Sequence, residues 1–414
     1  MTVRALDTGA PPSPRIACYS HDTVGLGHIR RNIAVAASMI NSWPGADAMM
    51  ITGNPEATSL WLPPRTDVVT LPTVTKDTAG NYRSRTLNAS LDSVVRMRSA
   101  LIEAAVTSFA PDLLIVDKVP LGVAGELLPA LRRLRDEHDT KIVLGLREIL
   151  DDPVSAVAEW NRSGATAAIE EFYDAVWIYG DRSVYDPIVE YGLPASVADR
   201  CVFTGYLAAD RFVDAGEPPP VPDPFTQPYV LCTVGGGQDG AELAQTFART
   251  PLPADHDGVV VCGPFMATAA RDIVHELAAG TPRMTVLDFV PDLHRLIAGA
   301  AAVVSMAGYN SVCEVLATDR PALLVPRTEP RTEQLVRAQR LLELGAADLL
   351  RQDVLTVERL SAWTAAAVAG SRSHADARTA LDIQGLRRLP AIAERLIATT
   401  ATRTTRRGVD HRAA

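Results

Sequence analysis

The residues best suited to chemistry lie in the second half of the chain, where a strand-like apolar run passes straight into a helical pattern. The run ends at Ser305, residues 306–310 read Met-Ala-Gly-Tyr-Asn, and the helical pattern that follows carries one acid, Glu314. A strand that runs directly into a helix directs several unpaired backbone N–H groups, and the positive end of the helix dipole, at one point. We therefore expect residues 305–310 to bind anionic oxygens.

Glu314 adds a second feature to this turn. It lies about one turn into the expected helix, too close to a bound phosphate to assist it but suitably placed to accept hydrogen bonds from sugar hydroxyls. The turn and the acid together predict a site for a nucleotide diphosphate with its ribose attached.

Each half of the chain also has a glycine-rich turn after its first apolar run. The residues singled out are Asp22, Gly25, Gly27 and His28 in the first half and Gly235, Gly236 and Gly237 in the second. A tight strand-to-helix turn explains either one alone. Because the two turns occupy corresponding positions, we expect them to line one site between two domains.

His28 is a candidate general base. A histidine in the first turn of a helix feels the positive end of the dipole, which lowers its proton affinity and keeps the imidazole neutral at cellular pH. A neutral imidazole can take a proton from a hydroxyl group. A packing role at the start of the helix remains open as the alternative.

The elements that must position these residues follow an alternating pattern. A chain of 414 residues that is 47% hydrophobic is large enough for two cores. The expected strands are 15–20, 48–52, 68–71, 113–117, 142–146 and 175–179 in the first half, and 229–234, 258–262, 284–289, 301–305 and 321–325 in the second. Helical spacing lies between them, with Ser90 as an expected N-cap. Apolar strands alternating with helices predict an α/β fold with parallel sheets covered on both faces.

The pattern restarts after a proline-rich segment, which predicts two doubly wound domains joined by a linker. The expected parts are a disordered N-terminus (1–14), a first domain (15–207), a linker (208–228), a second domain (229–388), a C-terminal helix (389–399) and a disordered tail (400–414). The tail is assigned as disordered because it has no apolar period.

Composition excludes several classes of function. The 49 acidic residues against 40 basic ones give a net charge of −9, which argues against a nucleic-acid surface. Without a signal pattern or an apolar run of about 20 residues, we expect a cytoplasmic protein. The five cysteines are widely spaced and the histidines have no ligand spacing, so neither disulfides nor a metal site is expected.

Two common cofactor motifs are missing. A nicotinamide site needs G-x-G-x-x-G, but position 30 is arginine, and no acid ends the second strand of either half. No lysine follows a glycine, so the chain lacks a P-loop. We therefore expect no cofactor.

Residues 233–347 resemble the C-terminal, donor-binding domain of family 28 glycosyltransferases. The motifs that carry this resemblance are GGGQDG, LDFVPDLHRLIAGAAAVVS, S-x-x-G-x-x-S-x-x-E, PALLVP and T-E-Q. The resemblance implies that Phe289 and Val290 border the nucleotide base, that Ser305, Gly308, Tyr309 and Asn310 face the diphosphate, that Glu314 holds the ribose, and that Glu333 and Gln334 contact the donor sugar.

The first half matches through G-x-G-H-x-x-R (25–31), which is similar to the opening of these transferases and of nucleotide-sugar hydrolases. In both groups a histidine at this place is associated with catalysis, which favours His28 as the base. The family's acceptor motifs are not evident. Arg147 and Asp151 are candidates for acceptor contact, although a loop of solvated charges explains them equally well.

The resemblance implies a GT-B fold and an inverting, metal-independent transferase that moves a sugar from a UDP-type donor to a hydroxyl acceptor. The acceptor could be lipid-linked, a glycan or a small molecule, so peripheral contact with the inner face of the membrane stays open. The alternatives are a nucleotide-sugar hydrolase or epimerase on the same fold, and a catalytically silent nucleotide-sugar-binding protein.

Overall fold

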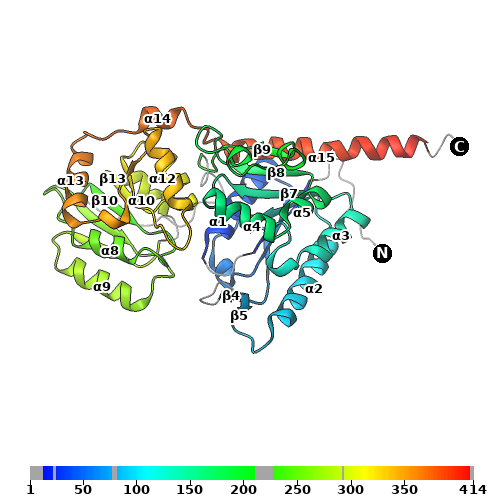
Figure 1. Cartoon of the computed structure of the whole chain (residues 1–414), viewed down its shortest axis with the longest axis horizontal. Helices are drawn as coiled ribbons and strands as arrows, with labels where there is room; N and C mark the ends of the chain where they lie inside the picture. The colour runs from blue at the N-terminus through cyan, green and yellow to red at the C-terminus, as the bar shows by residue number, and fades with distance from the viewer. Residues whose placement is uncertain (1–12, 22–24, 77–81, 210–226, 291–292, 411–414) are drawn as a thin grey trace.

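The computed structural model has two lobes lying side by side (Figure 1). It describes residues 13–21, 25–76, 82–209, 227–290 and 293–410, with the side chains of 399–410 left aside. Asp22 and most of the predicted linker therefore lie outside the described residues. Each lobe is built around one parallel sheet.

The N-terminal lobe contains a sheet of seven strands in the order β3-β2-β1-β6-β7-β8-β9. These strands are β1 (Arg15–Ser20), β2 (Asp47–Thr52), β3 (Thr66–Thr70), β6 (Leu113–Asp117), β7 (Lys141–Arg147), β8 (Ala175–Tyr179) and β9 (Cys201–Phe203). Strands β1, β6 and β8 have mostly or wholly buried residues, as expected for a parallel sheet with both faces covered. A small antiparallel hairpin, β4 (Val74–Lys76) and β5 (Tyr82–Ser84), lies apart from this sheet.

Helices connect these strands. They are α1 (Gly27–Ser42), α2 (Leu91–Phe109), α3 (Leu128–Glu137), α4 (Pro153–Arg162), α5 (Ala165–Phe172), α6 (Pro187–Glu190) and α7 (Ala195–Ala198), with 3₁₀ turns at Pro55–Ser59 and Val123–Gly125. The predicted N-cap is confirmed, because the Ser90 hydroxyl accepts a hydrogen bond from the backbone N–H of Ser93 at the start of α2. In contrast, α1 begins after Leu26, which provides no side-chain cap.

The C-terminal lobe has the same arrangement, a parallel sheet connected by helices, with six strands in the order β12-β11-β10-β13-β14-β15. Its strands are β10 (Tyr229–Thr233), β11 (Asp257–Val261), β12 (Met284–Leu287), β13 (Ala302–Ser305), β14 (Ala322–Leu324) and β15 (Asp348–Leu349). Its helices are α8 (Ala241–Ala248), α9 (Thr268–Ala279), α10 (Leu293–Gly299), α11 (Tyr309–Leu316), α12 (Glu333–Glu343), α13 (Val357–Val368) and α14 (Ala375–Thr379), with a 3₁₀ turn at Gln352–Val354.

Both sheets reverse their strand order at one place, which fixes where ligands can bind. In the N-terminal sheet the reversal lies between β1 and β6, and in the C-terminal sheet between β10 and β13. In doubly wound sheets, ligands bind outside the carboxyl ends of the strands at this switch point. The glycine-rich turns follow β1 and β10, and the turn before α11 follows β13, so all three lie at switch points.

The last helix returns to the first lobe, and it corrects one prediction. Helix α15 spans Gly385–Asp410 and packs against α1, where Leu389 is fully buried and the Ser38 hydroxyl donates to the Leu386 carbonyl. Figure 1 shows it lying along the N-terminal lobe and extending past it. We predicted a helix over 389–399 and disorder from 400, but the backbone is helical through Asp410. The absence of an apolar period predicts an unpacked segment, not a non-helical one.

A buried ion pair joins the two lobes. The carboxylate of Glu148, just after β7, accepts hydrogen bonds from Arg337 of α12, with Nε···Oε1 2.6 Å and Nη2···Oε2 3.2 Å. Both side chains are fully buried. Tyr206 donates to the same carboxylate at 3.0 Å, and Arg337 also donates to the Ala307 carbonyl at 2.9 Å. These bonds satisfy both charges and set the spacing between the lobes.

The sequence predicted the main strands at nearly the observed positions, but it missed β9, β15 and the β4–β5 hairpin, which are two or three residues long and lack a distinct apolar run. The five cysteines are free. Among the described residues, no helix is both long enough and apolar enough to cross a membrane.

We expect the Arg337→Ala variant to lose about 3–5 kcal/mol of unfolding free energy, because the change leaves Glu148 buried and unpaired. The matched control is Arg340→Ala, which removes a partly exposed ion pair with Glu190 between the same lobes and should cost at most about 1 kcal/mol. Urea denaturation measures both. Equal losses in the two variants would show that Glu148 is not held as described.

Candidate active site

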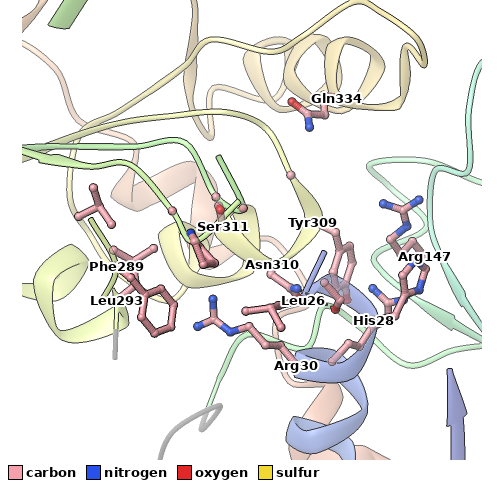
Figure 2. A pocket seen from close by; sticks show the side chains of 18 of the residues that line it. Leu26, His28, Arg30, Arg147, Phe289, Leu293, Tyr309, Asn310, Ser311 and Gln334 are labelled. Carbon is pink, nitrogen blue, oxygen red and sulfur yellow. Dashed lines mark hydrogen bonds between the residues drawn. The ribbon is translucent and has the colours of Figure 1, made fainter. Parts of the chain in front are cut away.

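A pocket of about 240 Å³ lies between the two switch points. Figure 2 shows His28 and Arg147 on one side of it, Phe289 and Leu293 on the other, and Asn310 between them. The lobes touch directly here, because the Asn310 amide donates to the Gly27 carbonyl at 2.9 Å. The pocket is therefore lined by both domains, as the paired glycine turns predicted.

His28 forms a dyad with a carboxylate that ends the neighbouring strand. His28 Nδ1 lies 2.6 Å from Oδ2 of Asp117, the last residue of β6, which is almost fully buried. Arg31, one turn further along α1, donates to Oδ1 of Asp117 at 2.7 Å. Nδ1 also lies 2.9 Å from Nη2 of Arg31. In the tautomer with the proton on Nδ1, the imidazole donates to the ionised carboxylate, which can only accept. The Nε2 lone pair of His28 is then free to act as a base.

The protonation states of the dyad follow from burial and charge. Burial lowers the pKa of His28 to about 4, although the charge and hydrogen bond of Asp117 act to raise it. Burial alone would raise the pKa of Asp117, but the charges of Arg31 and His28 hold it well below its usual value. At neutral pH the pair is therefore a neutral imidazole beside an ionised carboxylate.

The anion-binding features on the second lobe gather at the start of α11. This helix begins after Gly308 with no side-chain cap, and Gly308, Tyr309, Asn310 and Ser311 line the pocket. Gly235 and Gly236 face them from the turn after β10. The first turn of α11, with the positive end of its dipole, thus lies at the pocket opposite His28.

Most of the predicted residues line this pocket. They are Gly27, His28, Arg147, Gly235, Gly236, Phe289, Val290, Gly308, Tyr309, Asn310, Glu333 and Gln334. Tyr309 is also a packing residue, since it is almost fully buried and its hydroxyl accepts a hydrogen bond from the backbone N–H of Leu207 in the other lobe.

Four predicted residues do not line the pocket for local reasons. Ser305 is buried and its hydroxyl donates to the Met306 carbonyl. Gly237 has a φ of +89°, and a Cβ there would lie 2.3 Å from the Cys262 carbonyl oxygen, so it shapes the turn. Gly25 has its carbonyl bound by Asn54. Glu314 is buried one turn behind the pocket, with Oε1 3.4 Å from Nη2 of Arg30.

Asp151 is placed differently from our prediction of acceptor contact. It does not line the pocket, and its Oδ1 accepts hydrogen bonds from the backbone N–H of Thr332 at 2.9 Å and from its hydroxyl at 3.2 Å. Thr332 immediately precedes α12, so Asp151 occupies the start of a helix from the opposite lobe. This position makes it an interdomain contact.

The expected donor-sugar residues lie at the start of α12. Glu333 Oε1 accepts from Arg327 Nη2 at 2.7 Å, while Oε2 is buried without a partner among the described residues. The Gln334 side-chain oxygen accepts from the Arg327 backbone N–H at 3.3 Å. Arg327 also pairs with Asp239 of the glycine-rich turn at 3.2 Å. Arg327 thus links two of the five motifs, GGGQDG and T-E-Q.

The sequence did not single out Asp117, Arg31 or Arg327 for a role. A signal for Asp117 exists, because it is a polar residue that ends the strand beside β1, directly across the switch point from the glycine-rich turn. To predict a site at the switch point of a sheet, the order of the strands must be known, and the sequence pattern alone does not establish it. Once Asp117 is known to be buried, a cationic partner such as Arg31 is expected, because a buried carboxylate needs a cation nearby.

Comparison with known proteins places the second lobe in a family. Residues 231–393 match the Glycosyltransferase family 28 C-terminal domain. A related protein from Klebsiella pneumoniae subsp. pneumoniae is the UDP-N-acetylglucosamine--N-acetylmuramyl-(pentapeptide) pyrophosphoryl-undecaprenol N-acetylglucosamine transferase, 31% identical over 158 residues. That match covers 38% of this chain and 42% of the relative's length. The enzyme of the same name from Sorangium cellulosum is 28% identical over 64% of this chain and 70% of its own length.

Solved structures extend the likeness to both lobes. The MurG structure from Acinetobacter baumannii has a TM-score of 0.54 and 14% identity, with 92% of this chain and 99% of that one covered. The glycosyltransferase VinC, solved with dTDP, has a TM-score of 0.58 and 17% identity, with 94% and 100% covered. At these identities the likeness concerns the fold, and the fold is GT-B, as predicted.

We expect the imidazole of His28 to titrate near pH 4, well below the roughly 6.5 of a free histidine. The unfolded chain takes up a proton between these values while the folded protein does not, so His28 lowers the stability as the pH falls from 6.5 to 4. The imidazole chemical shifts of His28, followed by NMR against pH, measure the midpoint. A midpoint between pH 6 and 7 would show that the imidazole, whose side chain is 22% exposed, is not desolvated enough to lower its pKa.

Proposed function

We propose, from the premise that residues 231–393 form a glycosyltransferase family 28 C-terminal domain, that this protein is an inverting glycosyltransferase that needs no metal. It transfers a sugar from a nucleotide diphosphate donor, UDP by resemblance, to a hydroxyl group of an acceptor. The family match covers the second lobe, so the activity of the whole chain belongs to the proposal.

One observation carries the proposal: a base on one lobe faces a diphosphate-type site on the other within a single pocket. The base is His28 with Asp117 behind it, and the opposing site is the uncapped start of α11. Transfer from a nucleotide sugar needs these two functions on opposite sides of the anomeric carbon. A protein that only binds nucleotide sugars has no need of the first.

His28 activates the acceptor in this mechanism. Its Nε2 takes the proton from the acceptor hydroxyl as the oxygen attacks the anomeric carbon. Asp117 accepts the Nδ1 proton, which fixes the tautomer and stabilises the imidazolium that forms. Arg31 holds the carboxylate in place and keeps it ionised. The attack comes from the N-terminal lobe.

The C-terminal lobe stabilises the leaving group. As the bond to the sugar breaks, negative charge develops on the diphosphate, where the N–H groups at the start of α11 and the turn of Gly235 and Gly236 donate hydrogen bonds. Attack from one lobe and departure toward the other inverts the anomeric centre. Among the described residues no group of three or more histidine, cysteine or acidic side chains could hold a metal ion, and the backbone groups take that role in our proposal.

Glu314 is proposed to hold the ribose, and this requires Arg30 to move. In the structure Arg30 reaches from α1 to the Glu314 carboxylate across the domain boundary. A ribose whose hydroxyls donate to Glu314 takes the place of this contact. Donor binding therefore replaces this contact between the lobes.

The acceptor class stays broad. A lipid-linked sugar, a glycan or a small molecule each offers a hydroxyl group, and only the first would bring the protein to the inner face of a membrane. A nucleotide-sugar hydrolase or epimerase is the alternative on the same fold, because His28 could act on water or on the sugar itself.

An assay with nucleotide sugars in the presence of EDTA tests the function. We expect release of the nucleotide diphosphate to require an acceptor and to survive chelation, with the sugar recovered on the acceptor in the inverted configuration by NMR. Free sugar formed without an acceptor would indicate the hydrolase. Loss of activity in EDTA that magnesium restores would mean that a metal stabilises the leaving group.

His28→Ala should lower turnover by roughly 10²-fold or more while leaving the affinity for UDP nearly unchanged, because the base and the donor site lie on different lobes. Turnover per folded molecule and calorimetry with UDP measure the two quantities. Parallel losses of rate and affinity would assign His28 to the donor pocket. Lower thermal stability with normal turnover would assign it a packing role.

Glu314→Ala should weaken UDP binding by roughly 1.5–3 kcal/mol, the usual scale for hydrogen bonds to a charged group. The matched control is Arg30→Ala, which breaks the same ion pair but leaves the carboxylate free for the ribose, so UDP affinity should not fall. Calorimetry compares the two variants. If both bind UDP as the wild type does, Glu314 does not hold the ribose; if both lose affinity equally, the ion pair itself matters.

A further inference from the structure

The arginines at the pocket are neutralised by carboxylates, with one exception. The paired ones are Arg30 with Glu314 (3.4 Å), Arg31 with Asp117 (2.7 Å), Arg327 with Glu333 (2.7 Å) and, just behind the pocket, Arg337 with Glu148 (2.6 Å). Arg147 also lines the pocket, and among the described residues it has neither an ion pair within 4 Å nor a hydrogen bond from its side chain.

Arg147 is held in this position by the fold. It is the last residue of β7, in register with Tyr179 of β8. Its Nε is buried without a hydrogen-bond partner, and its side chain reaches the pocket near His28 (Figure 2). Arg147 as a whole is partly exposed, but a buried guanidinium nitrogen without a hydrogen-bond partner is costly, because its desolvation is not compensated. Such a group is retained where a ligand supplies the anion.

Among the described residues no carboxylate forms an ion pair with Arg147, although the charge of Glu333 acts on it from further away. Glu148 is bound by Arg337 and Tyr206, and Glu333 is bound through one oxygen by Arg327. Burial lowers the pKa of Arg147, Glu333 acts to raise it, and the charges of Arg31 and Arg337 lower it further. The charge of Glu148 also acts to raise the pKa of Arg147, so the lowering comes first from burial and the nearby charges act in both directions.

The diphosphate of the donor does not fill this position in our account. That group belongs at the start of α11 on the C-terminal lobe, whereas Arg147 comes from the N-terminal lobe, on the side of His28. The free oxygen of Glu333 faces the same pocket. The two residues thus frame the region where the transferred sugar and the acceptor meet.

Resting on the proposed function, we infer that Arg147 binds a second anionic group, a carboxylate or a phosphate, carried by the transferred sugar or by the acceptor. The guanidinium offers two parallel N–H groups, which match either anion in a bidentate contact. Arg147 is then a residue that determines specificity: it selects a substrate with a negative charge close to the reacting hydroxyl or to the sugar ring.

Calorimetry with a matched pair of donors tests the first source of the anion. UDP-glucose and UDP-glucuronate differ only in the carboxylate at C6. If the transferred sugar carries the anion, the wild type should bind UDP-glucuronate roughly tenfold more tightly or better, and Arg147→Gln should bind the two equally. Arg133→Gln, which removes the same charge from an exposed helix position far from the pocket, should behave as the wild type.

Inorganic phosphate tests the second source. If the acceptor carries the anion, the wild type should bind both donors equally. Phosphate should then bind to the UDP-saturated wild type and to UDP-saturated Arg133→Gln. It should bind to UDP-saturated Arg147→Gln roughly tenfold more weakly or not at all. The inference is overturned if Arg147→Gln retains every preference of the wild type, or if the wild type prefers neither anion.

Thermal denaturation without ligand separates binding from a structural role. Because Arg147 has no partner, Arg147→Gln should keep or raise the melting temperature, whereas Arg337→Ala should lower it. A comparable fall for Arg147→Gln would assign Arg147 to the fold and contradict the inference. If no nucleotide binds the wild type, the proposed function fails, but the difference in phosphate binding between wild type and Arg147→Gln still decides the role of Arg147.

Discussion

The buried ion pair between Glu148 and Arg337 is the interaction on which the site depends. It joins the end of β7 in one lobe to α12 in the other, and neither charge can be left alone without a large desolvation cost. It therefore holds the carboxyl edges of the two sheets at a fixed spacing. The pocket exists because these edges, each with its own switch point, face each other at that spacing.

The cost of burying an unpaired charge also determines how charged side chains are arranged around the pocket. Buried carboxylates and guanidinium groups come in pairs, and several pairs join segments far apart in the sequence, as Arg31 and Asp117 do in the first lobe. Two features lie outside this pairing: the starts of α1 and α11, which have no side-chain cap, and Arg147, whose Nε is buried without a partner among the described residues. All of them point to anions, so the composition of the pocket matches a ligand with several negative charges.

The fold could be predicted largely from the sequence, because parallel strands with both faces covered consist of continuous runs of apolar residues. Short edge strands such as β15 have no such run, and the helical continuation of α15 beyond residue 399 has no apolar period to signal it. Residues within motifs, such as Gly308 and Glu333, were found in the pocket. Asp117 was missed because its role depends on which strand lies beside β1, and Glu314 lies behind Arg30 because of a contact between domains that no local pattern records.

A crystal structure of the complex with UDP tests the central claim, that one pocket combines a diphosphate site on the C-terminal lobe with a base on the N-terminal lobe. Our account predicts diphosphate oxygens bound by the backbone N–H groups of residues 308–311, ribose hydroxyls at Glu314 with Arg30 displaced, and His28 facing the terminal phosphate across the space for the sugar. A nucleotide bound at the N-terminal switch point, or outside the pocket, would contradict it.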